Sequence, residues 1–390
     1  MPMMVLCKFL QHNRIYYFFL FGLALSGFLS PLQADADGGA PDLVYVAGSP
    51  GGVGIIDVAQ QKITGEFTVA GDPYTILLSP DGRELYVTQP ATGRVIAMAA
   101  KTKQMICSAT FPGHPALLAL NSDGTVLYVA GRNETTIIAL DPQTCGLQHS
   151  FQTTEPIYWI TAAGVSTANA LQTQLWVAGM SAVSILDEQG QILDSIPIAG
   201  GPRFLCIPNG LTAYVATRQG EVLAVDMVNH EVFASLLTKG TFGPMDYDAI
   251  TGEIYVPDQQ HNQVDVLSPV LAGSGLTPQE PTRVIHLSNS PQAIAITNDG
   301  QLGFIALSGG MVDMLDIPAR RLIKAFSLGG SPHFIITGPY PPPGVPTPRL
   351  TSATPLNIDF LIPILAVVAG AILGSFWLIL RQRSRRSSLP

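Results

Sequence analysis

Six residues at corresponding places in the sequence have side chains that could do chemistry together. Seven segments of the chain pass through a proline into a short apolar run, and the six residues lie directly before or after that proline: Asp72, Tyr74, His114, Glu155, Arg203 and His333. Carboxylates, imidazoles, a phenol and a guanidinium that converge at one place form the default site for a small ligand. The alternative is that they are solvated loop residues, which differ because nothing constrains them.

Other kinds of site have less support in the residue pattern. Two histidines and two carboxylates are donors that a divalent metal accepts, yet no short ligand spacing accompanies them. The sequence has no G-x-S-x-G, H-E-x-x-H or P-loop motif, and no C-x-x-C-H motif for covalent haem. We therefore assign the six residues to ligand binding and predict no metal, no cofactor and no catalytic residue.

The elements that must position these residues repeat seven times. Each copy centres on an aromatic residue in a segment such as "LYV", at intervals of about 43 residues, which is the spacing of a four-stranded propeller blade. The aromatic residues are Tyr45, Tyr86, Tyr128, Trp176, Tyr214, Tyr255 and Phe304. We expect an all-β, seven-bladed β-propeller over residues 43–338, in which the loops that lead into the inner strands crowd one face.

The repeat also assigns structural roles to two recurring residue types. The aromatic residues occur in every copy and are expected to form the core between blades rather than a binding stripe. An aspartate ends the third strand of most copies and is expected to form a turn. These aspartates are Asp57, Asp141, Asp187, Asp226 and Asp316.

The two ends of the repeat region are complementary. The chain enters at Leu43 on a second strand and leaves through residues 331–338, which read as a first strand. The last strand can therefore complete the first blade and leave no loose sheet edge. An open stack or a sandwich would not need this complementarity.

Two segments carry the resemblance to a known family. The stretches "SPDGRELYVTQPATGRVIAM" (79–98) and "NSDGTVLYVAGRNETTIIALD" (121–141) resemble the YVTN-type β-propeller repeat family, which is lactonase-like in fold. Members of that family include surface-layer proteins, lactonases and electron-transfer enzyme domains. The resemblance therefore implies a fold and leaves the activity open.

Apolar and basic segments at both ends predict a membrane topology. Residues 1–36 have a basic start, an apolar stretch and Ala34-Asp35-Ala36, which is typical of a signal peptide, with an uncleaved anchor as the alternative. Residues 360–380 carry no charge and span about 32 Å as a helix, enough to cross a bilayer. A proline-rich stalk, 339–357, precedes this helix, and a basic cytoplasmic tail, 381–390, follows it.

Charge and localisation follow from this topology. The region between the two terminal segments lies outside the membrane. Residues 35–359 carry 14 basic and all 28 acidic residues, a net charge of −14. This acidity argues against a nucleic-acid partner. We expect a single-pass protein of the cell membrane, with its propeller outside and its C-terminus in the cytoplasm.

Two further features leave alternatives open. Outside the signal peptide the cysteines are Cys107, Cys145 and Cys206, an odd number that argues against a disulfide framework, although a bond between the first two is possible. Asn133 begins a glycosylation sequon, which matters only in a host with that machinery.

The membrane helix carries a candidate dimerisation face. Its small residues Ala366, Gly370 and Gly374 are spaced by four and share one side of the helix, as in helix pairs that approach closely. The alternative is that this face packs against lipid. A homodimer through this helix is therefore one expected state, and a tethered monomer is the other.

For function, we expect a non-catalytic binding module at the cell surface, with a protein or saccharide ligand. A lactonase-like hydrolase with its site at the propeller mouth is one alternative, and a structural surface-layer component is another.

Overall fold

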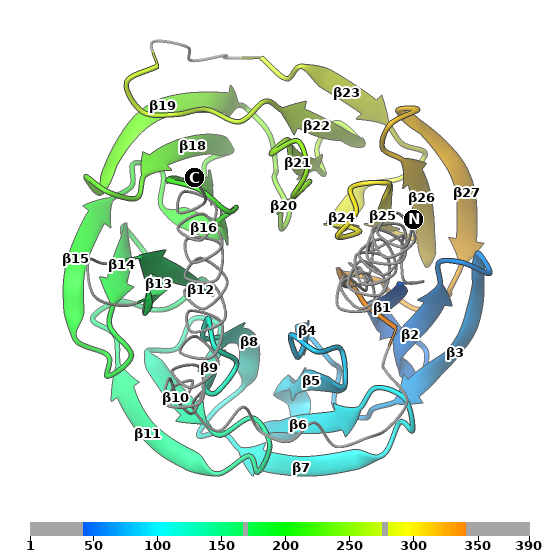
Figure 1. The fold of residues 1–390 in the computed structure, drawn as a ribbon, viewed down its shortest axis with the longest axis horizontal. Helices are drawn as coiled ribbons and strands as arrows, with labels where there is room; N and C mark the ends of the chain where they lie inside the picture. The colour runs from blue at the N-terminus through cyan, green and yellow to red at the C-terminus, as the bar shows by residue number, and fades with distance from the viewer. Residues whose placement is uncertain (1–41, 167–170, 275–279, 341–390) are drawn as a thin grey trace, which may run out of the picture. The chain divides into compact units, whose positions relative to one another are not determined.

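The computed structural model describes residues 42–166, 171–274 and 280–340. In this part of the chain, seven four-stranded antiparallel sheets are arranged as blades around a central axis (Figure 1). Each sheet is one blade, and its strands follow one another from the axis to the rim. The predicted all-β, seven-bladed propeller is therefore confirmed.

The innermost strands surround the axis and are β28 (Phe334–Gly338), β4 (Ile76–Leu78), β8 (Pro115–Leu120), β12 (Trp159–Ser166), β16 (Pro202–Cys206), β20 (Asp246–Tyr247) and β24 (Pro291–Ile296). The second strands are β1 (Leu43–Ser49), β5 (Glu84–Gln89), β9 (Leu127–Gly131), β13 (Leu171–Ala178), β17 (Thr212–Thr217), β21 (Ile254–Asp258) and β25 (Leu302–Leu307).

The third strands are β2 (Gly52–Asp57), β6 (Arg94–Ala99), β10 (Thr136–Leu140), β14 (Ala182–Leu186), β18 (Glu221–Asp226), β22 (Gln263–Leu267) and β26 (Met311–Asp316). The outer strands form the rim and are β3 (Lys62–Thr68), β7 (Met105–Thr110), β11 (Leu147–Gln152), β15 (Ile192–Pro197), β19 (Glu231–Thr238), β23 (Arg283–His286) and β27 (Arg321–Ser327). A short 3₁₀ helix, η1 (Pro90–Thr92), links β5 to β6.

The ring is closed by the last strand, as the complementary ends predicted. β28 pairs antiparallel with β1, from Leu43 opposite Gly338 to Ala47 opposite Phe334. The first blade therefore has the order β28-β1-β2-β3 and contains both ends of the repeat region. Closure satisfies the inner edge of β1, which would otherwise expose its backbone groups.

Two faces of the ring are distinguished by which connections they carry. The mouth face carries the loops from each outer strand to the next inner strand and the loops from second to third strands. The exit face carries the other turns, and the chain enters at Asp42 and leaves after Gly338 on this face. The proline-flanking residues belong to the mouth face.

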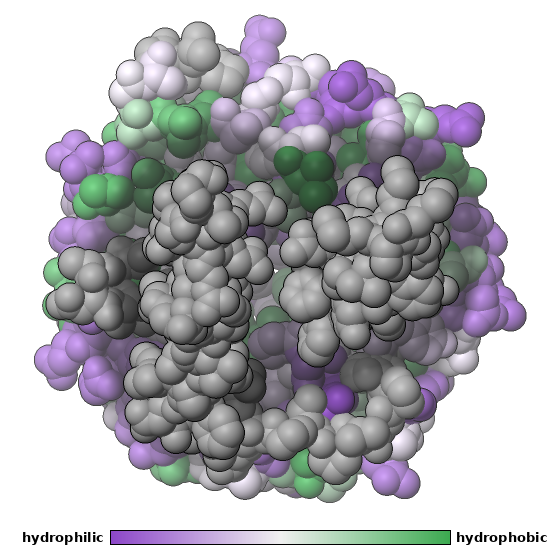
Figure 2. Space-filling view, viewed as in Figure 1, coloured by the Kyte–Doolittle hydropathy of each residue, from purple (hydrophilic) through white to green (hydrophobic). Residues whose placement is uncertain are grey.

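The core lies between neighbouring blades and contains the recurring aromatic residues. Trp176, Tyr45, Tyr86, Tyr128, Tyr214, Tyr255 and Phe304 are all fully buried. The second and third strands are buried on both faces because each blade is covered on two sides, whereas outer strands such as β3 are largely exposed. Figure 2 shows hydrophilic residues alternating with hydrophobic ones around the rim.

The aspartates that end the third strands form turns on the exit face. The Asp226 carboxylate accepts hydrogen bonds from the backbone N–H groups of Val228 at 2.8 Å and Asn229 at 3.2 Å. Asp57 binds the backbone N–H of Gln60 at 2.7 Å in the same way. These side chains satisfy turn N–H groups that the sheets leave unpaired, as expected for this residue type.

A disulfide bond joins two neighbouring blades at the rim. Cys107 in β7 is bonded to Cys145, which follows β10 and adopts a left-handed conformation with φ 55°. The odd cysteine count argued against a full disulfide framework and left this single bond possible. The remaining cysteine, Cys206, is a free, buried thiol packed inside a blade interface. Only the contact between blades two and three brings the other two sulfur atoms together.

Several predicted segments lie outside the described residues. They are the signal peptide 1–36, most of the stalk 339–357, the helix 360–380 and the tail 381–390. Of the helices in the described part of the chain, none has the length and apolar character needed to span a bilayer.

Candidate functional site

A small polar recess lies at the mouth, above the centre of the ring. It has a volume of about 100 Å³ and receives side chains from six of the seven blades. The lining residues are Tyr74, Trp159, Arg203, Phe204, Pro244, Gln259, Gln292, His333 and Phe334. Three of the six residues singled out in the sequence, Tyr74, Arg203 and His333, therefore converge here.

Arg203 is the principal charged group of the recess. Its Cζ atom lies 4.9 Å from the centre of the Phe204 ring, and its Nε atom is buried without a hydrogen-bond partner among the described residues. Burial and the nearby positive charge of Arg132 lower the pKa of Arg203, while Tyr74 acts in the opposite direction. A buried donor without a partner is costly, so the site is suited to an acceptor supplied by a ligand.

Tyr74 connects Arg203 to a second arginine. Arg132, in the loop between β9 and β10, donates a hydrogen bond from Nη1 to the Tyr74 hydroxyl at 2.7 Å. Its guanidinium also lies 5.8 Å from the centre of the Tyr74 ring. The Tyr74 hydroxyl is thus oriented by Arg132, and Tyr74 acts to raise the pKa of Arg203.

His333 has one nitrogen anchored and one free. Its Nδ1 atom lies 2.9 Å from the backbone oxygen of Ser331 and donates to it, because a carbonyl oxygen only accepts. Its Nε2 atom is buried without a partner among the described residues. In a neutral imidazole with its proton on Nδ1, the Nε2 lone pair points away from the Ser331 carbonyl.

The close approach that places His333 depends on Gly48. This glycine ends the regular part of β1 with φ 92°, and its carbonyl oxygen accepts a hydrogen bond from the Ser331 N–H at 2.7 Å. A Cβ atom at Gly48 would collide with the Ser331 carbonyl oxygen and the His333 ring. A glycine is therefore required both for the backbone conformation and for the space that the histidine occupies.

Aromatic residues form the floor of the recess. The Trp159 ring meets Phe204 edge-on at 5.2 Å between centroids and Phe334 at 5.9 Å. Trp159 and Phe334 also line the channel beneath, so these rings separate the recess from the interior of the ring. Aromatic faces of this kind offer flat apolar surface to a ligand placed above them.

A wider hollow adjoins the recess and contains Asp72. Its volume is about 590 Å³, and Tyr74 and His333 are shared with the recess, while Ser331 and the end of β1 complete its wall. Asp72 has a left-handed backbone, with φ 57°, which aspartate tolerates better than most residues. A fourth residue predicted from the sequence therefore belongs to the same region of the mouth.

The other two predicted residues lie elsewhere on the mouth face. The His114 side chain is 80 % exposed, and its backbone N–H and ring both meet the Glu134 carboxylate. Glu155 accepts hydrogen bonds from the Ser181 hydroxyl and, at 2.8 Å, from the Ser181 N–H, and these bonds lower its pKa. Both residues brace loops and do not line the recess.

The sequence analysis missed two residues of the mouth: Arg132, which binds the Tyr74 hydroxyl, and Gln259, which lines the recess. Both follow a second strand, and the loops after second strands reach the same face as the proline-containing loops. The repeat period marks these positions as clearly as it marks the prolines. The aromatic floor could be recognised in the same way, since Trp159, Phe204 and Phe334 stand two or three residues after their prolines.

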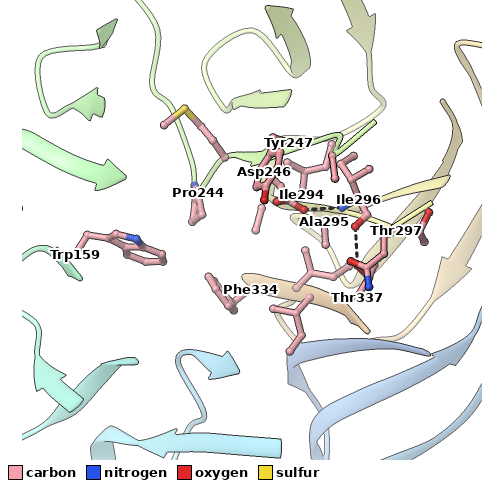
Figure 3. Close-up of a pocket in the computed structure, with 16 residues that line it drawn as sticks. Trp159, Pro244, Asp246, Tyr247, Ile294, Ala295, Ile296, Thr297, Phe334 and Thr337 are labelled. Atoms are coloured by element: carbon pink, nitrogen blue, oxygen red, sulfur yellow. Dashed lines mark hydrogen bonds between the residues drawn. The ribbon is translucent and has the colours of Figure 1, made fainter. Parts of the chain in front are cut away.

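Below the floor, the central channel contains an acidic group. Asp246 accepts a hydrogen bond from the Ile296 N–H at 2.7 Å, and the Thr337 hydroxyl donates to the Ile296 carbonyl at 2.7 Å (Figure 3). Burial raises the pKa of Asp246 to about 6. The cavities around it have volumes of about 310 and 280 Å³ and are lined mainly by inner-strand residues. Among the described residues, no group of three or more potential ligands could hold a metal ion.

Comparisons with known proteins support the fold. No protein-family model matches the chain, and no curated protein sequence matches it. Among solved structures, the periplasmic gluconolactonase PpgL of Pseudomonas aeruginosa is similar, with a TM-score of 0.61 over 76 % of this chain and 98 % of that chain at 17 % identity.

Two further structures have the same architecture. AztD of Citrobacter koseri in its apo form has a TM-score of 0.59 over 76 % of this chain and 98 % of that chain at 11 % identity. Hydrazine synthase of Kuenenia stuttgartiensis has a TM-score of 0.58 over 69 % of this chain and 90 % of that chain at 18 % identity. At these identities the likeness defines the class, a seven-bladed β-propeller, and leaves the activity open.

Proposed function

We propose that the protein is a membrane-anchored, extracytoplasmic propeller of the YVTN type that binds a protein or saccharide ligand at its mouth. The convergence of Tyr74, Arg203 and His333, from three different blades, carries this proposal. Two nitrogen atoms in the recess, Arg203 Nε and His333 Nε2, are buried without partners among the described residues.

One observation supports the proposed location. The bond between Cys107 and Cys145 is of a kind that persists in oxidising compartments, outside the cytoplasm.

Ligand binding at the mouth is testable with the full chain in nanodiscs. A saccharide array and a panel of purified surface proteins should contain a ligand that wild type binds and His333→Ala binds at least tenfold more weakly. His114→Ala is the matched control, because this histidine lies outside the recess, and it should bind as wild type. Equal binding by wild type and both variants would exclude the mouth as the binding site.

A lactonase-like hydrolase is the second candidate, and the orientation of His333 favours it. With Nδ1 held by the Ser331 carbonyl, Nε2 has the geometry of a general base that activates water. Arg203 would stabilise the developing oxyanion, and Asp72 lies in the adjoining hollow. This candidate predicts that His333→Gln abolishes lactone hydrolysis; a broad lactone panel with no turnover by wild type removes it.

The oligomeric state rests on the predicted membrane helix, which lies outside the described residues. Ala366, Gly370 and Gly374 would form the contact between two helices. In a membrane-helix association reporter that carries residues 358–382, replacing Gly370 and Gly374 with Ile should reduce the signal to background. An unchanged signal would identify the protein as a tethered monomer.

A further inference from the structure

Among the residues that the structure describes, the arginines at the mouth have no acidic partners, although the protein is rich in acids. Residues 35–359 include 28 acidic and 14 basic residues. In the described part of the chain, arginine–carboxylate ion pairs are formed by Arg83 with Asp81 and by Arg283 with Glu253, and neither pair lies at the mouth. The polar bonds of Arg132 and Arg218 go to tyrosine hydroxyls and a backbone oxygen.

Arg203 in the recess and Arg132 beside it also oppose each other electrostatically. Arg132 is bonded to the Tyr74 hydroxyl, and Tyr74 lines the recess together with Arg203. The positive charge of Arg132 lowers the pKa of Arg203, as does the burial of Arg203 itself. Like charges that are poorly solvated destabilise the charged forms of both groups. A bound anion would remove this cost and satisfy the buried Arg203 Nε–H at the same time.

We propose that the mouth selects anionic ligands, with Arg203 receiving a carboxylate or sulfate group carried by a saccharide and Arg132 adding positive charge from beside Tyr74. This inference rests on the proposed function and specifies its ligand class. At about 100 Å³, the recess has room for about three water molecules, or for one such group in their place. The adjoining hollow of about 590 Å³ is large enough for the sugar ring to which the group is attached.

The surroundings of the recess define how deeply the anion enters. Tyr74 presents an aromatic ring that is held in place by Arg132 and lies 5.4 Å from the His333 ring, so a sugar face can stack beside the charged group. Below the floor, the Asp246 carboxyl belongs to the central channel and would repel an anion that passed Trp159 and Phe334. The negative group is therefore retained at the level of the arginines.

The inference is tested with charged and neutral forms of the same saccharide, using the full chain in nanodiscs of zwitterionic lipid. The carboxylate probe is tetragalacturonate, compared with its fully methyl-esterified form. The sulfate probe is a sulfated galactan tetrasaccharide, compared with the desulfated form. Calorimetric titrations should show that at least one charged probe binds. Its neutral form should bind at least about tenfold more weakly or show no binding.

Variants connect this selectivity to the two arginines. Arg203→Gln and Arg132→Gln should each reduce binding of the charged probe about tenfold and reduce its salt dependence. Arg321→Gln, at the start of β27 on the exit face, makes the same change in net charge and should bind within about twofold of wild type. Melting temperatures of all three variants within about 2 °C of wild type establish that the ring is intact.

The outcomes separate this inference from the proposed function. Equal affinities for a charged probe and its neutral form, with both lost in His333→Ala, would overturn the anion selectivity and leave the mouth as the binding site. Equal loss in Arg321→Gln and Arg203→Gln would also overturn it, because long-range charge would then explain the effect. Absence of binding by both charged probes overturns the inference, whereas the ligand array with His333→Ala decides the proposed function independently.

Discussion

The two faces of the ring are built from the same repeats but differ in how their polar groups are satisfied. On the exit face, aspartates such as Asp226 and Asp57 bind backbone N–H groups within their own turns, and the pattern recurs around the ring. On the mouth face, Arg203 and His333 have buried nitrogen atoms without partners among the described residues, whereas the buried groups without partners toward the exit face include the neutral hydroxyls of Tyr45 and Tyr128. The repeat therefore fixes the turn residues of the exit face and leaves the residues of the mouth face variable.

This contrast explains why one repeat yields two kinds of surface. A turn of two to four residues must satisfy its N–H groups locally, so an acceptor at a fixed position is favoured in every copy. The mouth loops instead point toward a common axis, where a side chain from one blade meets side chains from five others. These residues therefore meet partners from other blades rather than the N–H groups of their own turns.

Removing the strand that connects the two faces should have the largest effect. β28 begins beside the mouth residues and ends where the chain leaves, and it pairs along β1 over five residues. A chain that ends at Ser331 exposes the inner edge of β1 and should melt ~10 °C or more below a chain that ends at Tyr340. Circular dichroism melts compare the two, and equal melting temperatures would contradict closure by β28.

Loss of the disulfide should destabilise the ring next most strongly. The bond between Cys107 and Cys145 closes a loop with a sequence separation of 38 residues. Replacing both cysteines with serine should lower the free energy of unfolding by ~2–4 kcal/mol, measured with urea. Reductant should lower the stability of wild type similarly and leave that of the double variant unchanged; an unaffected wild type would mean that the bond adds no stability.

The channel acid should make stability fall as pH rises. Because burial raises the pKa of Asp246 to about 6 from 3.8, the folded state holds its proton longer than the unfolded state. The free energy of unfolding should therefore decrease between about pH 4 and pH 6 and stay lower above it. Asp246→Asn should raise stability at pH 7.5 by about 2–3 kcal/mol and flatten this dependence. A variant less stable than wild type at pH 7.5 would refute this assignment.

Replacing a turn aspartate and replacing a mouth arginine should each change the free energy of unfolding by a small amount, and the two changes should differ in sign. Asp226→Ala removes the acceptor of two turn N–H groups and should cost about 1–2 kcal/mol. Backbone hydrogen bonds, chiefly from Val228, lower the pKa of Asp226, so this contribution is present at neutral pH and is lost as pH falls through the acid range.

Arg203→Gln should leave the urea midpoint unchanged or raise it slightly, because it removes a buried charge without a partner. Urea titrations at pH 7.5 and pH 4 measure both variants. A destabilised Arg203→Gln, or an Asp226→Ala that matches wild type at neutral pH, would remove the distinction between the two faces.

Much of the fold was predictable because it depends on local and periodic features. The spacing of residues such as Tyr86 and Tyr128 predicts the blades, and the complementary strand types at residues 43 and 331–338 predict closure. The turn role of Asp226 follows from residue type alone. The site was predictable in part, since the position after the proline identifies Tyr74, Arg203 and His333 as neighbours on one face.

Other features depended on distances between blades that no sequence interval records. His114 and Asp72 occupy equivalent positions beside their prolines, yet one meets Glu134 on an exposed loop and the other lines the hollow. Asp246 lies on an inner strand only two residues long, and its environment in the channel is formed by β24 and β28.

The sequence by itself determined the seven-fold repeat, the four strands of each copy, the aromatic core and the turn aspartates, because each depends on residues close together along the chain. Only the tertiary structure decided that Arg132 binds Tyr74 beside Arg203 in the recess, that Cys107 bonds Cys145, and that Gly48 makes room for His333. These contacts join different blades, and their geometry is determined when the ring closes and all seven inner strands take their places around one axis.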